Sequence, residues 1–322
     1  MSSQSRRTFI KRGIAVAGFG AGCAVAGPGA ARRLFAAEEP SPLRYSMCNE
    51  TFADWPQEKI FKFLGKCGYG GVEIAPFTIN TDVTKVSAKR RAVLRKQAED
   101  AGIEVVGLHW LLAKTEGLHL TSPDRKVRRK TAEYIGSLAD FCADLGGTVM
   151  VFGSPKQRDI LPGVSREDGM KYATEVLRNA MPVLSKRKVV LALEPLAAKE
   201  TNFMTTAAEG VELAKAVDSP NCKLLLDCKA MITEPTPIPQ LIRKYGDWLV
   251  HFHANDPNLR GPGMGELDFL PIFRALRDVN FKGWVSVENF NSTPGPEQTA
   301  RASLRYMRRI EAKLAGGSRK SG

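Results

Sequence analysis

Four side chains that can bind a metal ion end four consecutive apolar segments in the second half of the chain. Glu194 follows Leu-Ala-Leu, Asp227 follows Leu-Leu-Leu and Glu288 follows Val-Ser-Val, while His253 ends the segment Leu-Val-His-Phe-His. An ionised carboxylate directly after buried apolar residues is unfavourable unless it is paired or binds a metal. Three carboxylates and one imidazole favour a divalent ion such as Mn²⁺, Mg²⁺ or Co²⁺, and Zn²⁺ also fits. The residue types therefore predict one divalent metal ion with open coordination positions for substrate oxygens.

Two histidines lie close together in the third of these segments. His251 and His253 are two residues apart, and alternate side chains of a strand point to the same face. We therefore expect both imidazoles on the same side of the strand. His253 is nearer the end of the segment and is the predicted ligand, whereas His251 is expected to fill the layer beneath it or to support the site.

Short apolar runs alternate with longer helical segments from residue 43 onward, and this pattern must position the candidate ligands. The runs are continuously apolar, as in parallel strands that are covered on both faces. Eight such units over residues 43–314 predict an α/β protein with a single (β/α)₈ TIM barrel. The predicted strands are 44–49, 71–75, 104–109, 148–152, 189–194, 223–227, 248–253 and 284–288, and the predicted helices are 57–67, 87–101, 124–145, 167–186, 205–217, 237–245, 268–279 and 296–314.

An open, doubly wound sheet is the alternative arrangement of the same units. No Gly-x-Gly-x-x-Gly fingerprint follows the first predicted strand, so nothing in the sequence supports dinucleotide binding on such a sheet. In a barrel, the carboxyl ends of the strands form the catalytic face. The barrel therefore predicts that the four candidate ligands meet at one mouth.

Residues 1–37 have the composition of an export signal. Arg6 and Arg7 are followed by Phe9 and Lys11, by a mildly apolar stretch rich in Gly and Ala, and by small residues up to Ala37. A basic region, a short apolar region and a small-residue cleavage zone describe a signal peptide, and the twin arginine predicts export by the Tat translocon. We expect a Tat-type signal peptide at residues 1–37, the barrel at 43–314, a disordered tail at 315–322 and a periplasmic location.

The positive charge of the chain is partly explained by this segment. The net charge is +13, and residues 1–37 contain six of the 47 Lys and Arg residues but none of the 34 Asp and Glu residues. The remaining surplus lies mainly in clusters such as 89–91 and 125–130, which read as solvated outer faces of helices. We therefore expect no nucleic-acid partner. The five cysteines beyond the signal lie largely in apolar runs and are expected to be free thiols.

The motifs at the strand ends resemble the xylose-isomerase-like sugar isomerase and epimerase superfamily. This superfamily includes ketose 3-epimerases, hydroxypyruvate isomerases and inosose dehydratases, and the resemblance covers residues 43–312. The matching pieces are Leu-Glu194-Pro, Leu-Leu-Asp227, His-Phe-His253-Ala-Asn-Asp, Pro262-Gly-Met-Gly-Glu-Leu-Asp-Phe and Gly283-Trp-Val-Ser-Val-Glu288.

The resemblance implies roles for individual residues. It makes Glu194, Asp227, His253 and Glu288 the metal ligands, with Glu194 and Glu288 also exchanging a proton with the substrate. Glu200 falls where the ketose 3-epimerases keep a substrate-contacting Glu, and Arg260 lies one residue beyond the position of their substrate-binding Arg. One departure is Ala230, which stands where those enzymes usually have His; the nearby Lys229 is a candidate to replace its hydrogen bond.

Polar residues also end the first three predicted strands, at Glu50, Glu73 and His109 with Trp110. Glu50 and His109 are further candidates for substrate binding, because hydrogen-bonding groups line sugar pockets. A homo-oligomer is compatible with the resemblance, but no segment identifies an interface.

The predicted activity is isomerisation or epimerisation of a sugar. A metal chelated by two adjacent substrate oxygens acidifies the C–H beside a carbonyl and stabilises an enediolate, while carboxylates move the proton. The same site suits a dehydratase or lyase acting on an oxidised sugar or cyclitol, which is the main alternative. A DNA-repair enzyme of the endonuclease IV type, with three zinc ions and many histidines, is disfavoured because the chain has only four His. A non-catalytic sugar-binding barrel is disfavoured by the intact set of ligands.

Overall fold

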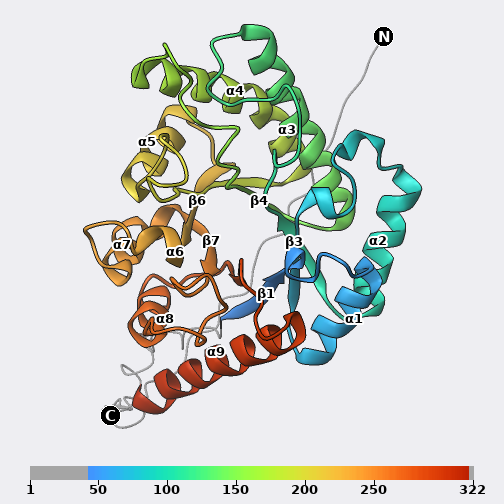
Figure 1. The fold of residues 1–322 in the computed structure, drawn as a ribbon, viewed down its shortest axis with the longest axis vertical. Coiled ribbons are helices and arrows are strands. Elements are labelled where there is room, and N and C mark those ends of the chain that lie inside the picture. The colour runs from blue at the N-terminus through green and yellow to red at the C-terminus, as the bar shows by residue number, and fades with distance from the viewer. Residues whose placement is uncertain (1–42, 319–322) are drawn as a thin grey trace, which may run out of the picture. The chain divides into compact units, whose positions relative to one another are not determined.

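The computed structural model describes residues 43–318, which form a closed barrel of eight parallel strands surrounded by helices (Figure 1). Each strand pairs with the next, and the last pairs with the first. The predicted TIM barrel is therefore confirmed. The strands are β1 Arg44–Cys48, β2 Gly71–Ile74, β3 Glu104–Leu108, β4 Val149–Phe152, β5 Val190–Leu193, β6 Cys222–Asp227, β7 Leu249–Ala254 and β8 Trp284–Val287.

The helices overlap the predicted segments, with one short addition after β6. They are α1 Gln57–Cys67, α2 Ala88–Asp100, α3 Arg125–Leu145, α4 Arg166–Arg187, α5 Ala207–Val217, α6 Cys228–Met231, α7 Ile238–Tyr245, α8 Phe269–Asp278 and α9 Pro296–Ser318. Four short 3₁₀ turns are also present in residues 43–318: η2 Asn49–Phe52, η3 Pro76–Thr78, η4 Val83–Lys85 and η5 Gly246–Trp248.

Local sequence signals explain where the helices begin and end. Side chains of Ser87 and Thr206 accept hydrogen bonds from the first turns of α2 and α5, which satisfies free backbone N–H groups there. Helices α1 and α3 end at Gly68 and Gly146, with φ values of 94° and 95°. Only glycine adopts this left-handed conformation without steric penalty.

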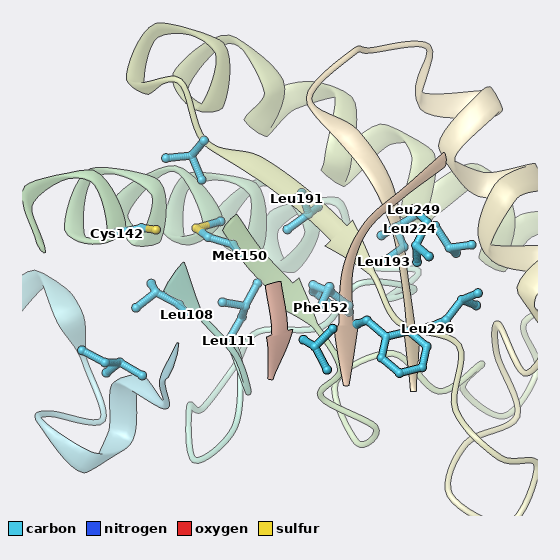
Figure 2. Packing of buried hydrophobic residues seen from close by; sticks show 14 of the residues in the cluster. Leu108, Leu111, Cys142, Met150, Phe152, Leu191, Leu193, Leu224, Leu226 and Leu249 are labelled. Carbon is cyan, nitrogen blue, oxygen red and sulfur yellow. The ribbon is translucent and has the colours of Figure 1, made fainter. Parts of the chain in front are cut away.

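The hydrophobic core has two layers because side chains alternate along each strand. A large cluster fills the space between the strands and the helices, and Figure 2 shows part of it, with Met150 and Leu191 on strands and Cys142 on α3. A small inner cluster includes Ala192 of β5 and Leu225 of β6. Alternation from these two inner residues turns the side chains two positions later, Glu194 and Asp227, toward the barrel mouth.

The last helix extends beyond its predicted end. Helix α9 continues to Ser318, so the tail expected at 315–322 is wrong for residues 315–318. Lys313, Leu314 and Ala315 are strong helix formers and extend the last helix. Residues 319–322 and the signal peptide expected at 1–37 lie outside the described residues. Within residues 43–318, no helix has the length and apolar character needed to cross a bilayer, and the five cysteines there are free.

Candidate metal centre

The carboxyl ends of β5 to β8 bring the four predicted ligands together. Glu194 follows β5, Asp227 ends β6, His253 lies near the end of β7, and Glu288 follows β8. One donor atom from each lies within 4.8 Å of the others, and all four residues are buried. His253 Nδ1 lies 3.2 Å from Glu288 Oε2 and 3.6 Å from Glu194 Oε1.

Two features of this cluster fit a divalent cation. His253 Nδ1 is buried beside the carboxylates but makes no hydrogen bond among residues 43–318, so this nitrogen is available as a ligand atom. A Cβ atom at Gly153, which follows β4, would lie 1.8 Å from Glu194 Oε2. Any larger residue at position 153 would therefore collide with the Glu194 carboxylate. An imidazole nitrogen with several carboxylate oxygens is a donor set that Mn²⁺, Mg²⁺, Co²⁺ and Zn²⁺ accept.

The electrostatics of the metal-free cluster point the same way. Burial and the negative charges of Glu288 and Glu194 raise the pKa of Asp227 to about 7. Burial alone would lower the pKa of His253, but Glu288 and Glu73 outweigh it and raise that pKa well above its usual range. Both raised pKa values mean that the clustered carboxylates favour bound protons. A divalent ion would supply positive charge at the same place.

The Asp227 carboxylate is held by the segments that follow its own strand, β6, and the neighbouring strand, β7. Its Oδ1 accepts a hydrogen bond from the Ala230 backbone N–H at 2.8 Å, in the first turn of α6. Its Oδ2 accepts from Asn255 Nδ2 at 2.5 Å. The sequence analysis did not single out Asn255, although it stands in the His-Ala-Asn-Asp motif that follows β7.

Glu73 of β2 lies beneath the cluster and contacts both histidines of β7. Its Oε2 is 2.8 Å from His251 Nε2 and 3.3 Å from His253 Nε2, and its side chain is fully buried. Burial would raise the pKa of Glu73, but the two histidines lower it well below its usual range. With the His253 hydrogen on Nε2 directed at Glu73, Nδ1 is left free toward the carboxylates, as in other carboxylate–histidine–metal arrangements.

Glu50 and His109 pair with each other beside the metal centre. His109 Nε2 lies 2.6 Å from Glu50 Oε2, and the His109 side chain is 1% exposed. Burial would lower the pKa of His109, but the charge of Glu50 raises it. Donor atoms of both residues lie within 4.8 Å of Glu288, so the structure brings this pair to the edge of the site.

A narrow cavity of about 20 Å³ lies beside Glu194 and Glu288. The rings of Trp110 and Phe290 meet edge to face across it, 6.3 Å between centroids, and Lys229 Nζ lies 2.6 Å from Glu200 Oε1. Sugar pockets combine aromatic walls with a few polar groups in this way. The cavity is lined by Trp110, Gly153, Pro155, Glu194, Leu196, Glu200, Lys229, Glu288 and Phe290.

Two arginines lie outside this lining. The predicted substrate contact Arg260 directs Nη2 to the backbone oxygen of Thr293 at 2.8 Å, so the structure does not bring its guanidinium to the cavity wall. Arg158 is fully buried and donates from Nη1 to the backbone oxygen of Glu194 at 2.6 Å. The sequence analysis missed Arg158, because its partners are backbone atoms that no motif reveals.

A family model described as xylose isomerase-like TIM barrel matches residues 61–310. D-psicose 3-epimerase of Agrobacterium fabrum is 28% identical over 255 residues, which are 76% of this chain and 85% of that protein. A probable ketose 3-epimerase of Synechocystis is 26% identical over 73% of this chain and 79% of its own length.

Solved structures show the same fold. D-psicose 3-epimerase of Clostridium cellulolyticum, solved with D-tagatose, matches with a TM-score of 0.72 and 22% identity over 84% of this chain and 99% of that chain. The 3-keto-D-glucoside 4-epimerase of Escherichia coli matches with a TM-score of 0.73 and 21% identity over 83% of this chain and 100% of that chain.

Proposed function

This chain belongs to the xylose isomerase-like TIM barrel family, and we propose that it is a metal-dependent sugar epimerase of the isomerase class. The observation that carries the proposal is the cluster of Glu194, Asp227, His253 and Glu288, whose donor atoms converge on one point at the barrel mouth. The two relatives named above are ketose 3-epimerases by name. Their reaction favours epimerisation over the dehydratase alternative.

The four clustered residues would hold one divalent ion. When bound, the ion would acidify the C–H beside the carbonyl of a chelated sugar and offset the negative charge that develops there. His253 supplies Nδ1, with its hydrogen kept on Nε2 by Glu73. Asp227 is fixed by Ala230 and Asn255, so its role is to hold the ion.

Glu194 and Glu288 are the proposed proton carriers. They follow β5 and β8, approach His253 Nδ1 from different strands and also line the cavity. Epimerisation needs one group that removes a proton and another that returns it on the opposite face. We propose that Glu194 and Glu288, which both line the cavity, act on opposite faces of the bound sugar.

The proposed substrate is a ketose or a keto derivative of a sugar. Trp110 and Phe290 offer apolar surface to a sugar ring or chain, while Glu200 and Lys229 offer polar contacts. Glu50, His109 and Arg260 remain proposed substrate contacts, with the Glu50–His109 pair the nearest of these to Glu288.

We also propose that the protein is exported through the Tat translocon to the periplasm. The proposal rests on Arg6-Arg7 and the apolar stretch that follows them. Replacing both arginines by lysine should keep the full-length precursor in the cytoplasm, measured by fractionation and mass. A precursor that is still exported would contradict the Tat route.

The activity is tested by incubating the Mn²⁺-loaded protein with D-fructose, D-psicose or D-tagatose in D₂O. We expect the C3 epimer to form with deuterium at C3, and we expect neither result after the metal is removed. Loss of water from an oxidised sugar, without exchange in any ketose, would contradict the epimerase proposal.

A further inference from the structure

We propose that Lys229 is a substrate-binding residue that determines specificity by donating hydrogen bonds to a sugar oxygen beside the metal centre, with Glu200 holding its ammonium group. This inference rests on the proposed function. It concerns a side chain whose direction the sequence left open. The ligand chemistry is that of two neighbouring oxygens of an uncharged sugar, one that accepts and one that donates a hydrogen bond.

The backbone of Lys229 is fixed relative to the metal ligands. It is the second residue of α6, which begins immediately after Asp227. Its N–H donates to Asn255 Oδ1 at 2.8 Å, and the same Asn255 side chain donates to Asp227. The base of the lysine side chain therefore cannot shift without disturbing a ligand.

The ammonium group reaches the cavity with unused donors. Among residues 43–318, the one hydrogen bond of Lys229 Nζ is the 2.6 Å contact with Glu200 Oε1. An ammonium group has three N–H donors, so two remain. The side chain is only 6% exposed and lines the cavity together with Glu194 and Glu288.

Glu200 offers the matching acceptor. Its Oε2 is buried and makes no hydrogen bond in the described structure. The pair therefore presents free donors and one free acceptor to the same cavity. Buried polar groups without partners are unfavourable, and a sugar hydroxyl next to a carbonyl satisfies both.

The ring of Phe290 sets the third side of this pocket. Lys229 Nζ lies 4.7 Å from the ring centroid, within the range of a cation–π contact. The charge is already balanced by Glu200, and the lining contains no second cation. An uncharged sugar thus fits this corner better than a phosphate ester or a sugar acid.

A purely structural ion pair between α6 and the loop after β5 is the competing explanation. It predicts that removing the charge changes the melting temperature and leaves sugar recognition alone. A recognition role predicts the opposite, because a site built to hydrogen-bond an oxygen rejects an analogue that lacks it. The two explanations can therefore be distinguished by measuring how a substitution at Lys229 changes the preference for fructose over a deoxy analogue.

The test compares Lys229→Met, which keeps the side-chain length, with Lys229→Arg. Lys199→Met is the control, because Lys199 is exposed and directly precedes Glu200. Each Mn²⁺-loaded protein is assayed for kcat and KM with D-fructose, for binding of singly deoxygenated fructoses, and for Mn²⁺ affinity by calorimetry. We expect kcat/KM to fall about 100-fold in Lys229→Met, with Mn²⁺ affinity and the Lys199→Met control unchanged and with partial recovery in Lys229→Arg. The preference of the wild type for fructose over one deoxy analogue should disappear in Lys229→Met.

Unchanged kcat and KM in Lys229→Met, with the wild type active, would overturn the Lys229 proposal alone. If Lys229→Met loses Mn²⁺ binding, the role of Lys229 is structural. The same holds if Lys229→Met still prefers fructose over its deoxy analogues as the wild type does. A wild-type protein that binds Mn²⁺ but neither binds nor converts any ketose would overturn the proposed function, and this inference with it.

Discussion

The two halves of the barrel carry polar side chains at similar positions but connect them differently. At the ends of β5 to β8, the donor atoms of Glu194, Asp227, His253 and Glu288 lie within 4.8 Å of one another. In β1 to β3, Glu73 is bonded to His251 and His253, and Glu50 is bonded to His109. A carboxylate paired with a histidine orients it, as Glu73 does for His253. Glu50 Oε1 and His109 Nδ1 are buried without a hydrogen bond among residues 43–318, and this pair has donor atoms within 4.8 Å of Glu288, so it belongs to the edge of the site.

The comparison assigns different consequences to the two halves. Substitutions in the second half should remove the chemistry or the ion itself. Those in the first half should act through His253 or through the substrate, and their effects should be smaller.

Glu288→Gln and Glu194→Gln should have the largest effect on turnover. Each removes a proposed proton carrier, and general acid–base catalysis contributes about 10²- to 10⁴-fold. We expect C3 exchange in D₂O to fall by at least the lower of these factors, with the circular dichroism spectrum unchanged. Near-full exchange by either variant would remove that residue from the proton path.

Glu73→Gln should weaken metal binding about 10- to 100-fold, which is the usual effect of changing a residue that orients a metal ligand. The amide can bind His253 Nε2 through either its oxygen or its nitrogen, so it no longer fixes the hydrogen on Nε2. Calorimetric titration with Mn²⁺ measures the change. Cys48→Ser is the control, because Cys48 Sγ also donates to Glu73 Oε2, at 3.7 Å, and its other hydrogen bond among residues 43–318 is with Ser286. Equal affinity in Glu73→Gln and wild type would show that the two halves are not coupled through His253.

Metal binding should strengthen as the pH rises through 7. The pKa of Asp227 is raised to about 7 in the metal-free protein, so its proton stabilises the metal-free fold at low pH. That stabilisation is lost as the pH rises through this value, and the ion then takes the place of the proton. The apparent affinity should rise by up to about tenfold per pH unit for one displaced proton. The increase in Tm on adding Mn²⁺ should therefore grow between pH 6 and pH 8; a constant increase would contradict the raised pKa.

Glu50→Gln should have the smallest effect on metal affinity. Glu50 contacts His109 and not His253, so the metal ligands keep their arrangement. We expect its Mn²⁺ affinity to stay much closer to wild type than that of Glu73→Gln, with any change appearing in KM for the ketose. A loss as large as in Glu73→Gln would place Glu50 among the groups that hold the ion.

The sequence predicted the second half of the site better than the first. Each candidate ligand there follows its own apolar strand, and the barrel itself brings strand ends together, so local patterns sufficed. The role of Glu73 depends on a contact across the barrel with residues far away in the chain, and no local pattern encodes it. The direction of Lys229 depends on α6, a single turn whose start is fixed by Asp227.

Arg260 is a loop residue, so its proposed contact with the substrate depends on more than its spacing from His253. Its position in the loop after β7 resembles that of a substrate-binding arginine but is shifted by one residue. In the structure its guanidinium binds the backbone of Thr293. Strand-end positions tolerate such transfer because alternation fixes their direction, whereas loop positions do not.

The central claim is that Glu194, Asp227, His253 and Glu288 hold one divalent ion. The most direct test is the metal content of the purified protein by elemental analysis, compared with His253→Ala and with His119→Ala, a control in the loop between β3 and α3. The account predicts about one ion of Mn, Co, Mg or Zn per chain in the wild type and in His119→Ala, and almost none in His253→Ala. Equal metal content in all three proteins, or no ion in the wild type after each metal is supplied, would contradict it.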